Sequence, residues 1–372
     1  MAYRFGRVRA TAATVTDCHF LVPGALDRPT GGSRYDQTIV TGLRAAGRSV
    51  AVHELPGRYP DGDATARQTV AAALSRIPAG QRVIVDGLVL GGLADVFAGH
   101  AQRLRLDALI HHPLADETGI DPDRARQWLA DEARAVALAE RVITTSRFTA
   151  HRLSVLGIHH GSVHVIPPGC APRPLATGSP GDNPVLLCVA SLTPRKAQHH
   201  LLDALSRLTD RPWYCRLVGP TDLDPDYAAA IAAQRDRLAL GDRVEIDGAV
   251  GADQLDTAYR TADLFILPSV YEGFGMVISE AVAHGLPIVT TTGGALATTL
   301  PEGAGIAVRP DDPEALATAL ASVLDHPERR HDLARGARRA RDQLNSWNKS
   351  VADFIDLLEE DSSCPSDSRP SG

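Results

Sequence analysis

Two glutamates, Glu272 and Glu280, stand eight positions apart around a glycine-rich stretch of the sequence. Eight residues of α-helix make roughly two turns, so both carboxylates would lie on one side of a helix, with Glu280 deeper than Glu272. Such a pair can accept hydrogen bonds from the hydroxyls of a polyol lying across the helix start. For an isolated pair, the ordinary alternative is a capping role for Glu272 and a solvated position for Glu280.

The residues around the first glutamate predict a turn between a buried strand and a helix. Leu264–Leu267 is a short apolar run, typical of a parallel strand covered on both faces. A glycine-bearing turn from such a strand into a helix can present free backbone amides to an anion. The turn and the first helical residues comprise Glu272, Gly273, Phe274, Gly275, Met276 and Val277.

Two cations occupy a second loop of the same kind. Arg195 and Lys196 follow an expected buried strand at 185–191 and precede an expected helix from His200 onward. In most loops such residues are ordinary surface charges. Beside an acid-bearing pocket on the same sheet edge, they would stabilise the charge that develops on a diphosphate leaving group.

The first half of the chain offers a further anion-binding turn. Gly31 and Gly32 follow the strand-like run Cys18–Pro23 and precede a helical pattern. They could let a phosphate approach the backbone, although a simple tight turn explains two glycines equally well. No Gly-x-Gly-x-x-Gly fingerprint is present, which argues against a dinucleotide site.

A histidine pair ends another expected strand. His111 and His112 follow Leu106–Ile110, at the edge of the sheet where ligands of parallel α/β folds gather. An imidazole there can donate to sugar hydroxyls or to a leaving oxygen near neutral pH. A buried structural histidine is the alternative. Ser146, which precedes an expected helix, is better explained as its N-cap than as a catalyst.

The composition bounds the remaining possibilities. The chain has 372 residues, enough for two domains, and 44% hydrophobic residues. Five scattered cysteines favour neither a disulfide framework nor a zinc site, and they suggest the cytoplasm. No apolar run suits a signal peptide or a membrane span, and no clustered basic stripe suits a nucleic acid. Residues 1–170 carry a net charge of +3, so peripheral contact with an anionic membrane stays open.

The stretch from Glu272 to Glu280 resembles the signature of glycosyltransferase family 4, in which seven residues separate two glutamates. The match covers both acids and the intervening Gly-Phe-Gly. Members of that family are retaining nucleotide-sugar glycosyltransferases with two Rossmann-like α/β domains facing across a cleft, the GT-B fold. The resemblance implies transfer of a hexose-type sugar from a nucleoside diphosphate sugar, without a metal or another cofactor, in glycan or glycoconjugate biosynthesis.

The resemblance also implies roles for individual residues. His111 would be the functional histidine, with His112 as the alternative. Lys196 matches a family lysine, but Ser191 stands where the family has arginine and Ala197 where it has glycine, so Arg195 would supply the missing charge. Catalysis would involve His111, Glu272 and Lys196, and the donor would contact Gly31, Gly32, Ser191, Arg195, Lys196, Glu272, Gly273, Phe274, Gly275, Met276, Val277 and Glu280.

The same resemblance divides the chain. We expect an acceptor-side domain at 1–168, a linker at 169–183, a donor-binding domain at 184–343, a helix returning to the first domain at 344–360 and a disordered tail at 361–372. The acceptor, whether a small molecule, a lipid-linked sugar or a growing glycan, has no decodable motif.

Three alternatives follow from the same architecture. A nucleotide-sugar epimerase or a phosphorylase would bind the same donor class. A non-catalytic sugar-nucleotide-binding protein would explain Ser191 and Ala197. A metal-binding Asp-x-Asp element would have to be Asp222 and Asp224, which we expect in a loop outside the cleft.

Overall fold

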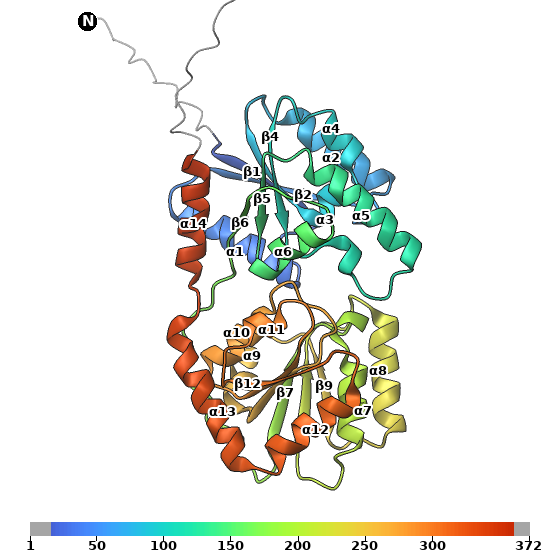
Figure 1. Cartoon of the computed structure of the whole chain (residues 1–372), viewed down its shortest axis with the longest axis vertical. Helices are drawn as coiled ribbons and strands as arrows, with labels where there is room; N and C mark the ends of the chain where they lie inside the picture. Colours follow the sequence, from blue (N-terminus) through green and yellow to red (C-terminus); the bar gives the residue numbers. More distant parts are fainter. Residues whose placement is uncertain (1–15, 361–372) are drawn as a thin grey trace, which may run out of the picture.

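The computed structural model describes residues 16–360, which form two α/β domains stacked one above the other (Figure 1). The expectations for the first residues and for the tail at 361–372 lie outside the described part. Each domain is built on a six-stranded parallel sheet. The predicted fold class, two tandem Rossmann-like domains, is therefore confirmed.

The first sheet has the strand order β2-β1-β3-β4-β5-β6. Its strands alternate between two cores: Phe20 of β1 packs into one and the next residue, Leu21, into the other. Apolar residues at successive positions are what a sheet covered on both faces requires. The strands are β1 (Cys18–Pro23), β2 (Val50–Leu55), β3 (Arg82–Asp86), β4 (Arg105–Ile110), β5 (Arg141–Thr144) and β6 (Val163–Val165).

Helices cover both faces of this sheet. Side-chain caps begin several of them; for example, the Ser146 hydroxyl accepts from the amide of Thr149, which confirms its predicted capping role. The helices are α1 (Gly31–Ala45), α2 (Ala64–Arg76), α3 (Gly87–Gly91), α4 (Ala94–Ala98), α5 (Pro122–Val136) and α6 (Arg147–Val155), with a 3₁₀ turn at Leu114–Asp116.

The second sheet has the order β12-β11-β10-β7-β8-β9. Its chain order reverses between β7 and β10, and ligands of open α/β sheets bind outside the strand ends at such a point. The strands are β7 (Val185–Val189), β8 (Tyr214–Val218), β9 (Val244–Gly248), β10 (Leu264–Leu267), β11 (Ile288–Thr291) and β12 (Gly305–Val308).

The helices of the second domain differ from expectation mainly at their ends. The helix expected from His200 begins at Gln198. The sequence pattern also predicts a helix at 328–344; it spans Pro327–Ala340 and continues as a 3₁₀ turn. The helices are α7 (Gln198–Ser206), α8 (Pro225–Arg237), α9 (Ala252–Thr261), α10 (Met276–Ala283), α11 (Leu296–Thr299), α12 (Pro313–Leu324) and α13 (Pro327–Ala340), with 3₁₀ turns at Pro194–Lys196 and Arg341–Gln343.

The chain passes between the domains twice, and the two crossings touch. After α13 the chain returns to the first domain as α14 (Trp347–Glu359), which lies beside α1 (Figure 1). Phe354 of α14 packs against Phe20 and Tyr35. Gly169 lies so close to the start of α14 that a Cβ atom there would meet the Trp347 nitrogen at 2.0 Å.

None of the helices in the described part, residues 16–360, is both long enough and apolar enough to span a lipid bilayer.

Candidate active site

A cavity of about 790 Å³ lies between the two domains, and residues of both domains line it. The carboxyl ends of the strands in both sheets face it, because the loops after β1, β4, β7 and β10 supply much of its wall. This is the edge at which parallel α/β folds bind ligands. Every residue that we assigned from the sequence to catalysis or donor binding lines this cavity.

The loop between β10 and α10 depends on its glycines. Gly275 has a φ of 86°, in the left-handed region that favours glycine, and turns the chain into α10. Gly273 passes so close to the first domain that a Cβ atom would stand 2.1 Å from the carbonyl oxygen of His111. The start of α10 lines the cavity, and at Gly273 the loop backbone meets the opposite domain without an intervening side chain.

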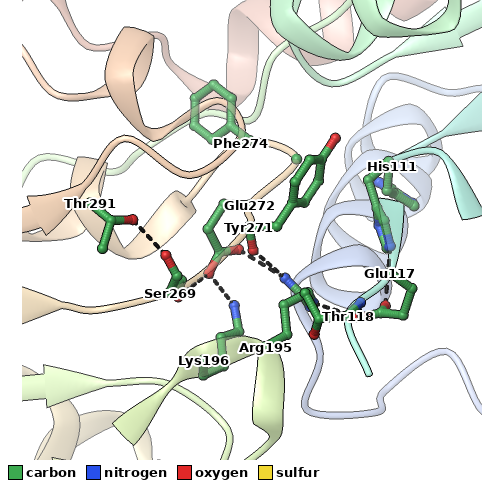
Figure 2. Close-up of polar contacts among 12 residues, drawn as sticks. His111, Glu117, Thr118, Arg195, Lys196, Ser269, Tyr271, Glu272, Phe274 and Thr291 are labelled. Carbon is green, nitrogen blue, oxygen red and sulfur yellow. Dashed lines mark hydrogen bonds and ion pairs between the residues drawn. The ribbon is translucent and has the colours of Figure 1, made fainter. Parts of the chain in front are cut away.

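Glu272 is buried at the centre of a polar cluster (Figure 2). Its carboxylate accepts from the Ser269 hydroxyl at 2.7 Å and from the Lys196 ammonium at 2.5 Å, and Arg195 lies 3.4 Å away. Burial raises the pKa of Glu272, but the neighbouring Lys196 and Arg195 outweigh burial and hold that pKa below its usual value. Glu272 is therefore an ionised acceptor.

Arg195 connects the domains. Its guanidinium donates to the Tyr271 carbonyl at 2.9 Å and pairs with Glu117 of the first domain at 3.2 Å (Figure 2). Burial raises the pKa of Glu117, but a hydrogen bond with His112 and the charge of Arg195 lower it to about 2. Arg195 thus uses part of its donor set within the protein, and it lines the same cavity as Lys196 and Ser191.

Glu280 is the fifth residue of α10, a little over one turn from its start, and has different partners. It accepts from the Tyr259 hydroxyl at 2.9 Å and from Arg34 of α1 at 2.5 Å. The two glutamates of the motif therefore occupy separate positions: Glu272 next to the cations, and Glu280 beside a tyrosine and an arginine. Both carboxylates line the cavity.

The start of α1 faces the start of α10. Thr30 caps α1, and a Cβ atom on Gly31 would lie 3.8 Å from the methyl carbon of Met276. The positive ends of two helices consequently converge on one side of the cavity. Gly32 lies against the ring of His111, with its Cβ position 3.2 Å from Cδ2.

The two histidines point to different partners. His111 Nε2 lies 3.2 Å from Asp36 and 3.6 Å from Asp86, whereas His112 Nε2 lies 3.3 Å from Glu117. Asp36, Asp86 and His111 form the one group within 16–360 whose potential ligand atoms all lie within 4.8 Å of one another. Because the imidazole contacts both carboxylates directly, ion pairing accounts for this arrangement, and we assign no metal to it.

The position of the loop with Asp222 and Asp224 differs from the one that we expected. We expected it outside the cleft, but Pro220 and Leu223 of the same segment line the cavity. The two aspartates themselves do not line it, and Asp224 caps α8 through the amide of Tyr227.

Four polar residues of the cavity or its immediate support were not assigned from the sequence: Arg34, Asp36, Asp86 and Glu117. Asp86 ends a strand at the ligand-facing edge and could have been noticed for that reason. Arg34 and Asp36 lie in the first turns after the glycine pair, but nothing in the sequence indicates their partners, which come from distant parts of the chain.

Comparison with known proteins adds three findings. The family described as "Glycosyl transferases group 1" matches residues 175–340. The chain is 26% identical to the MMP alpha-(1->4)-mannosyltransferase of Mycolicibacterium hassiacum over 79% of this chain and 75% of that protein. Several proteins named D-inositol 3-phosphate glycosyltransferase are 30–32% identical, and the chain spans only 56–60% of their length.

Solved structures share the arrangement of both domains. Sucrose-phosphate synthase from Thermosynechococcus elongatus superposes with a TM-score of 0.78 at 22% identity, over 93% of this chain and 99% of that one. Anabaena HepE, in complex with UDP and glucose, gives 0.73 at 21% identity, over 94% and 100%. At these identities the likeness establishes the fold.

Proposed function

Because residues 175–340 match the group 1 glycosyl transferases and the chain has the GT-B fold, we propose that it transfers a sugar from a nucleoside diphosphate sugar to an acceptor hydroxyl, with retention and without a metal ion. The observation that carries this proposal is the buried Glu272, paired with Lys196 at the cavity between the domains. The proposed donor nucleotide is UDP, which HepE binds in its solved complex.

Lys196 and Arg195 stabilise the departing diphosphate in this proposal. The bond between the anomeric carbon and the diphosphate oxygen breaks, and the charge that remains on the phosphate is met by the cations and by the amide-bearing starts of α1 and α10. Arg195 can take the place of the family arginine at Ser191, because both residues line the same cavity. The acceptor oxygen bonds to the anomeric carbon, and its proton passes to the leaving phosphate.

The two glutamates hold different parts of the donor. Glu272, ionised and beside Lys196, accepts hydrogen bonds from the transferred sugar, while Glu280 accepts from the ribose hydroxyls. His111 contributes a donor from the first domain, so the complete site uses both domains. The protein positions the reactants and stabilises charge, and it supplies no nucleophile.

The acceptor belongs to the first domain in this proposal. The loops after β1 and β4 form its side of the cavity, with Arg28 and Thr118, and Gln37 of α1 lines the same side. Relatives named for D-inositol 3-phosphate and for sucrose phosphate make sugar phosphates and polyol phosphates the first acceptors to test.

A donor panel read by mass spectrometry tests the proposal. UDP-, GDP- and ADP-sugars are incubated with the protein, with and without a mixture of polyols and sugar phosphates, and products are identified by mass. We expect one donor to be consumed only with an acceptor, in EDTA as well as in buffer. Glu272→Gln and Lys196→Ala should abolish or strongly reduce consumption, whereas Glu302→Gln, at an exposed position, should not.

Two outcomes contradict the proposal. Conversion of a donor into its epimer without an acceptor would identify an epimerase. Loss of all transfer in EDTA, restored by a divalent cation, would show that the reaction depends on a metal.

A further inference from the structure

Three elements of the first domain bring two carboxylates to one imidazole. Asp36 lies on α1, Asp86 ends β3 and His111 follows β4. The Nε2 atom of His111 is 3.2 Å from Asp36 Oδ1 and 3.6 Å from Asp86 Oδ2. Both aspartates are buried, at 1% and 4% exposure, so solvent contributes little to their stabilisation.

His111 is the one cation that pairs with these two aspartates among residues 16–360. The other neighbours are neutral: Asp86 also accepts from the Leu88 amide, and the ring of Tyr35 meets His111 edge-on. From the second domain, the loop glycine Gly273 approaches the backbone of His111 and brings no side chain. Two buried acids therefore share a single compensating charge.

The electrostatic consequence is a stabilised imidazolium. Burial lowers the pKa of His111, but Asp36, which both attracts and hydrogen-bonds it, and Asp86 raise that pKa to about 9. Burial and the neighbouring Asp36 raise the pKa of Asp86 to about 7. Opposite charges at hydrogen-bonding distance commonly shift a pKa by about 1 to 3 units, so this direction is expected from the geometry alone.

The other ring nitrogen is available to a ligand. His111 lines the cavity, its Nε2–Cδ2 edge lies against Gly32 and Asp36, and Nδ1 has no hydrogen-bond partner within the described chain. Nδ1 is not one of the fully buried polar atoms that lack a hydrogen-bond partner. Since it has no partner, it is not sealed in the protein interior. An imidazolium held through Nε2 carries a second N–H at Nδ1.

We propose that Asp36 and Asp86 are positioning residues that keep His111 protonated and fix its ring, so that Nδ1–H donates from the first domain to the oxygen-rich donor in the cleft. This inference rests on the proposed sugar transfer and deepens it, because it makes the first domain supply a cation opposite Lys196. A neutral histidine with Nε2 protonated would satisfy an aspartate but would offer no Nδ1 proton.

The first test measures the protonation of His111 directly and needs no activity. The ring carbon and nitrogen resonances of His111 are followed from pH 5 to 10 in the wild type, and they are assigned by their loss in His111→Gln. We expect titration near pH 9, and titration lower by about one pH unit or more in Asp36→Asn and in Asp86→Asn. Titration of wild-type His111 near the ordinary 6.5 overturns the inference.

The second test uses turnover as a function of pH. If the protonated imidazole is the active form, transfer should decline as the pH rises through about 9 in the wild type, and the decline should move to lower pH in the two Asn variants by the same interval as the NMR titration. The matched control is Asp107→Asn. Asp107 is also buried and ion-paired, with Arg82 and Arg141, but it does not line the cavity.

The outcomes separate the two claims. Asn variants with a lower melting temperature and an unchanged pH profile, as expected for Asp107→Asn, would mean that Asp36 and Asp86 only support the fold. If no donor reacts with the wild type, the proposed function fails, and the NMR titration still decides whether the two aspartates hold His111 as a cation. If one Asn variant does not fold, the other variant and the wild-type titration suffice.

Discussion

Glu280 and Glu272 belong to one sequence motif but have different hydrogen-bond partners. Tyr259 and Arg34 hold its carboxylate, and Arg34 comes from the opposite domain. Glu272 instead pairs with the cations of its own domain. The two acids of one motif therefore serve different parts of a ligand.

Replacing Glu280 should weaken nucleotide binding. We expect Glu280→Gln to reduce the affinity for the free nucleoside diphosphate by about 1 to 3 kcal/mol, the range of a hydrogen bond to a charged group. Calorimetry with UDP measures the change, and Glu302→Gln serves as the control. Unchanged affinity would mean that Glu280 does not hold the ribose.

Ala197 carries a small conformational strain. It adopts φ 52° and ψ 39°, left-handed values that favour the glycine found in the family this chain resembles. For a residue with a Cβ atom this strain is about 1 to 2 kcal/mol. Replacing Ala197 by glycine would relieve the strain but would also remove a buried methyl group, which costs about 0.8 kcal/mol.

We therefore expect Ala197→Gly to increase the free energy of unfolding by about 0.2 to 1.2 kcal/mol. Urea denaturation measures it. Ala230→Gly, in the exposed interior of α8, should have the opposite effect by about 1 kcal/mol. A destabilised Ala197→Gly protein would show that the methyl contact outweighs the strain.

At the scale of elements, the close approach of the β10–α10 loop to β4 decides how the domains meet. The Ser146 hydroxyl at the start of α6 donates to the Gly273 carbonyl at 2.7 Å, and Tyr271 donates to Asp116 at 3.0 Å. Backbone and hydroxyl contacts of this kind leave no room for a larger residue at Gly273.

Gly273→Ala should therefore impair transfer more than folding. The added methyl group would overlap the His111 carbonyl, and the two domains would have to separate locally. We expect turnover to fall at least 10-fold, the loss that about 1.4 kcal/mol of the barrier would cause, with a nearly unchanged melting temperature. Gly181→Ala is the matched control, since nothing lies within 4 Å of its Cβ position. Normal turnover would mean that this approach is not needed for catalysis.

The sequence predicted the elements better than their ends and partners. Short apolar runs such as Leu264–Leu267 identified buried strands, because a sheet covered on both faces leaves little choice of residue. The predicted end of α13, at Leu344, was wrong because the chain tightens into a 3₁₀ turn after Ala340. Asp36 and Asp86 were missed as partners of His111 because only the assembled sheet brings α1, β3 and β4 together.

At the scale of the whole molecule, the site depends on two domains joined by two short crossings. The segment 169–183, which we expected to be a linker, is attached to the second domain. The amides of Ala176 and Thr177 donate to the carbonyls of His284 and Arg260 there. The crossings meet where Cys170 donates to Asn345. Relative motion is therefore best accommodated close to Gly169 and the start of α14.

We expect the free protein to exchange between this arrangement, in which the domains touch through contacts such as that of Arg195 with Glu117, and a more open one, with the nucleotide favouring closure. Small-angle scattering should give a smaller radius of gyration with saturating UDP than without it. Glu117→Gln, which removes a charge from the contact with Arg195, should increase the radius of the free protein. An identical radius in all three states would mean that the domains do not move.

The stereochemistry of the product shows whether the cleft transfers a sugar from a nucleoside diphosphate with retention. The reaction of the donor identified in the panel is followed by proton NMR from the first minutes, and the coupling constant of the anomeric proton is compared between donor and product. We expect a new glycosidic signal with the anomeric configuration of the donor, formed by the wild type and absent with Lys196→Ala. A first-formed product of the opposite configuration would contradict it.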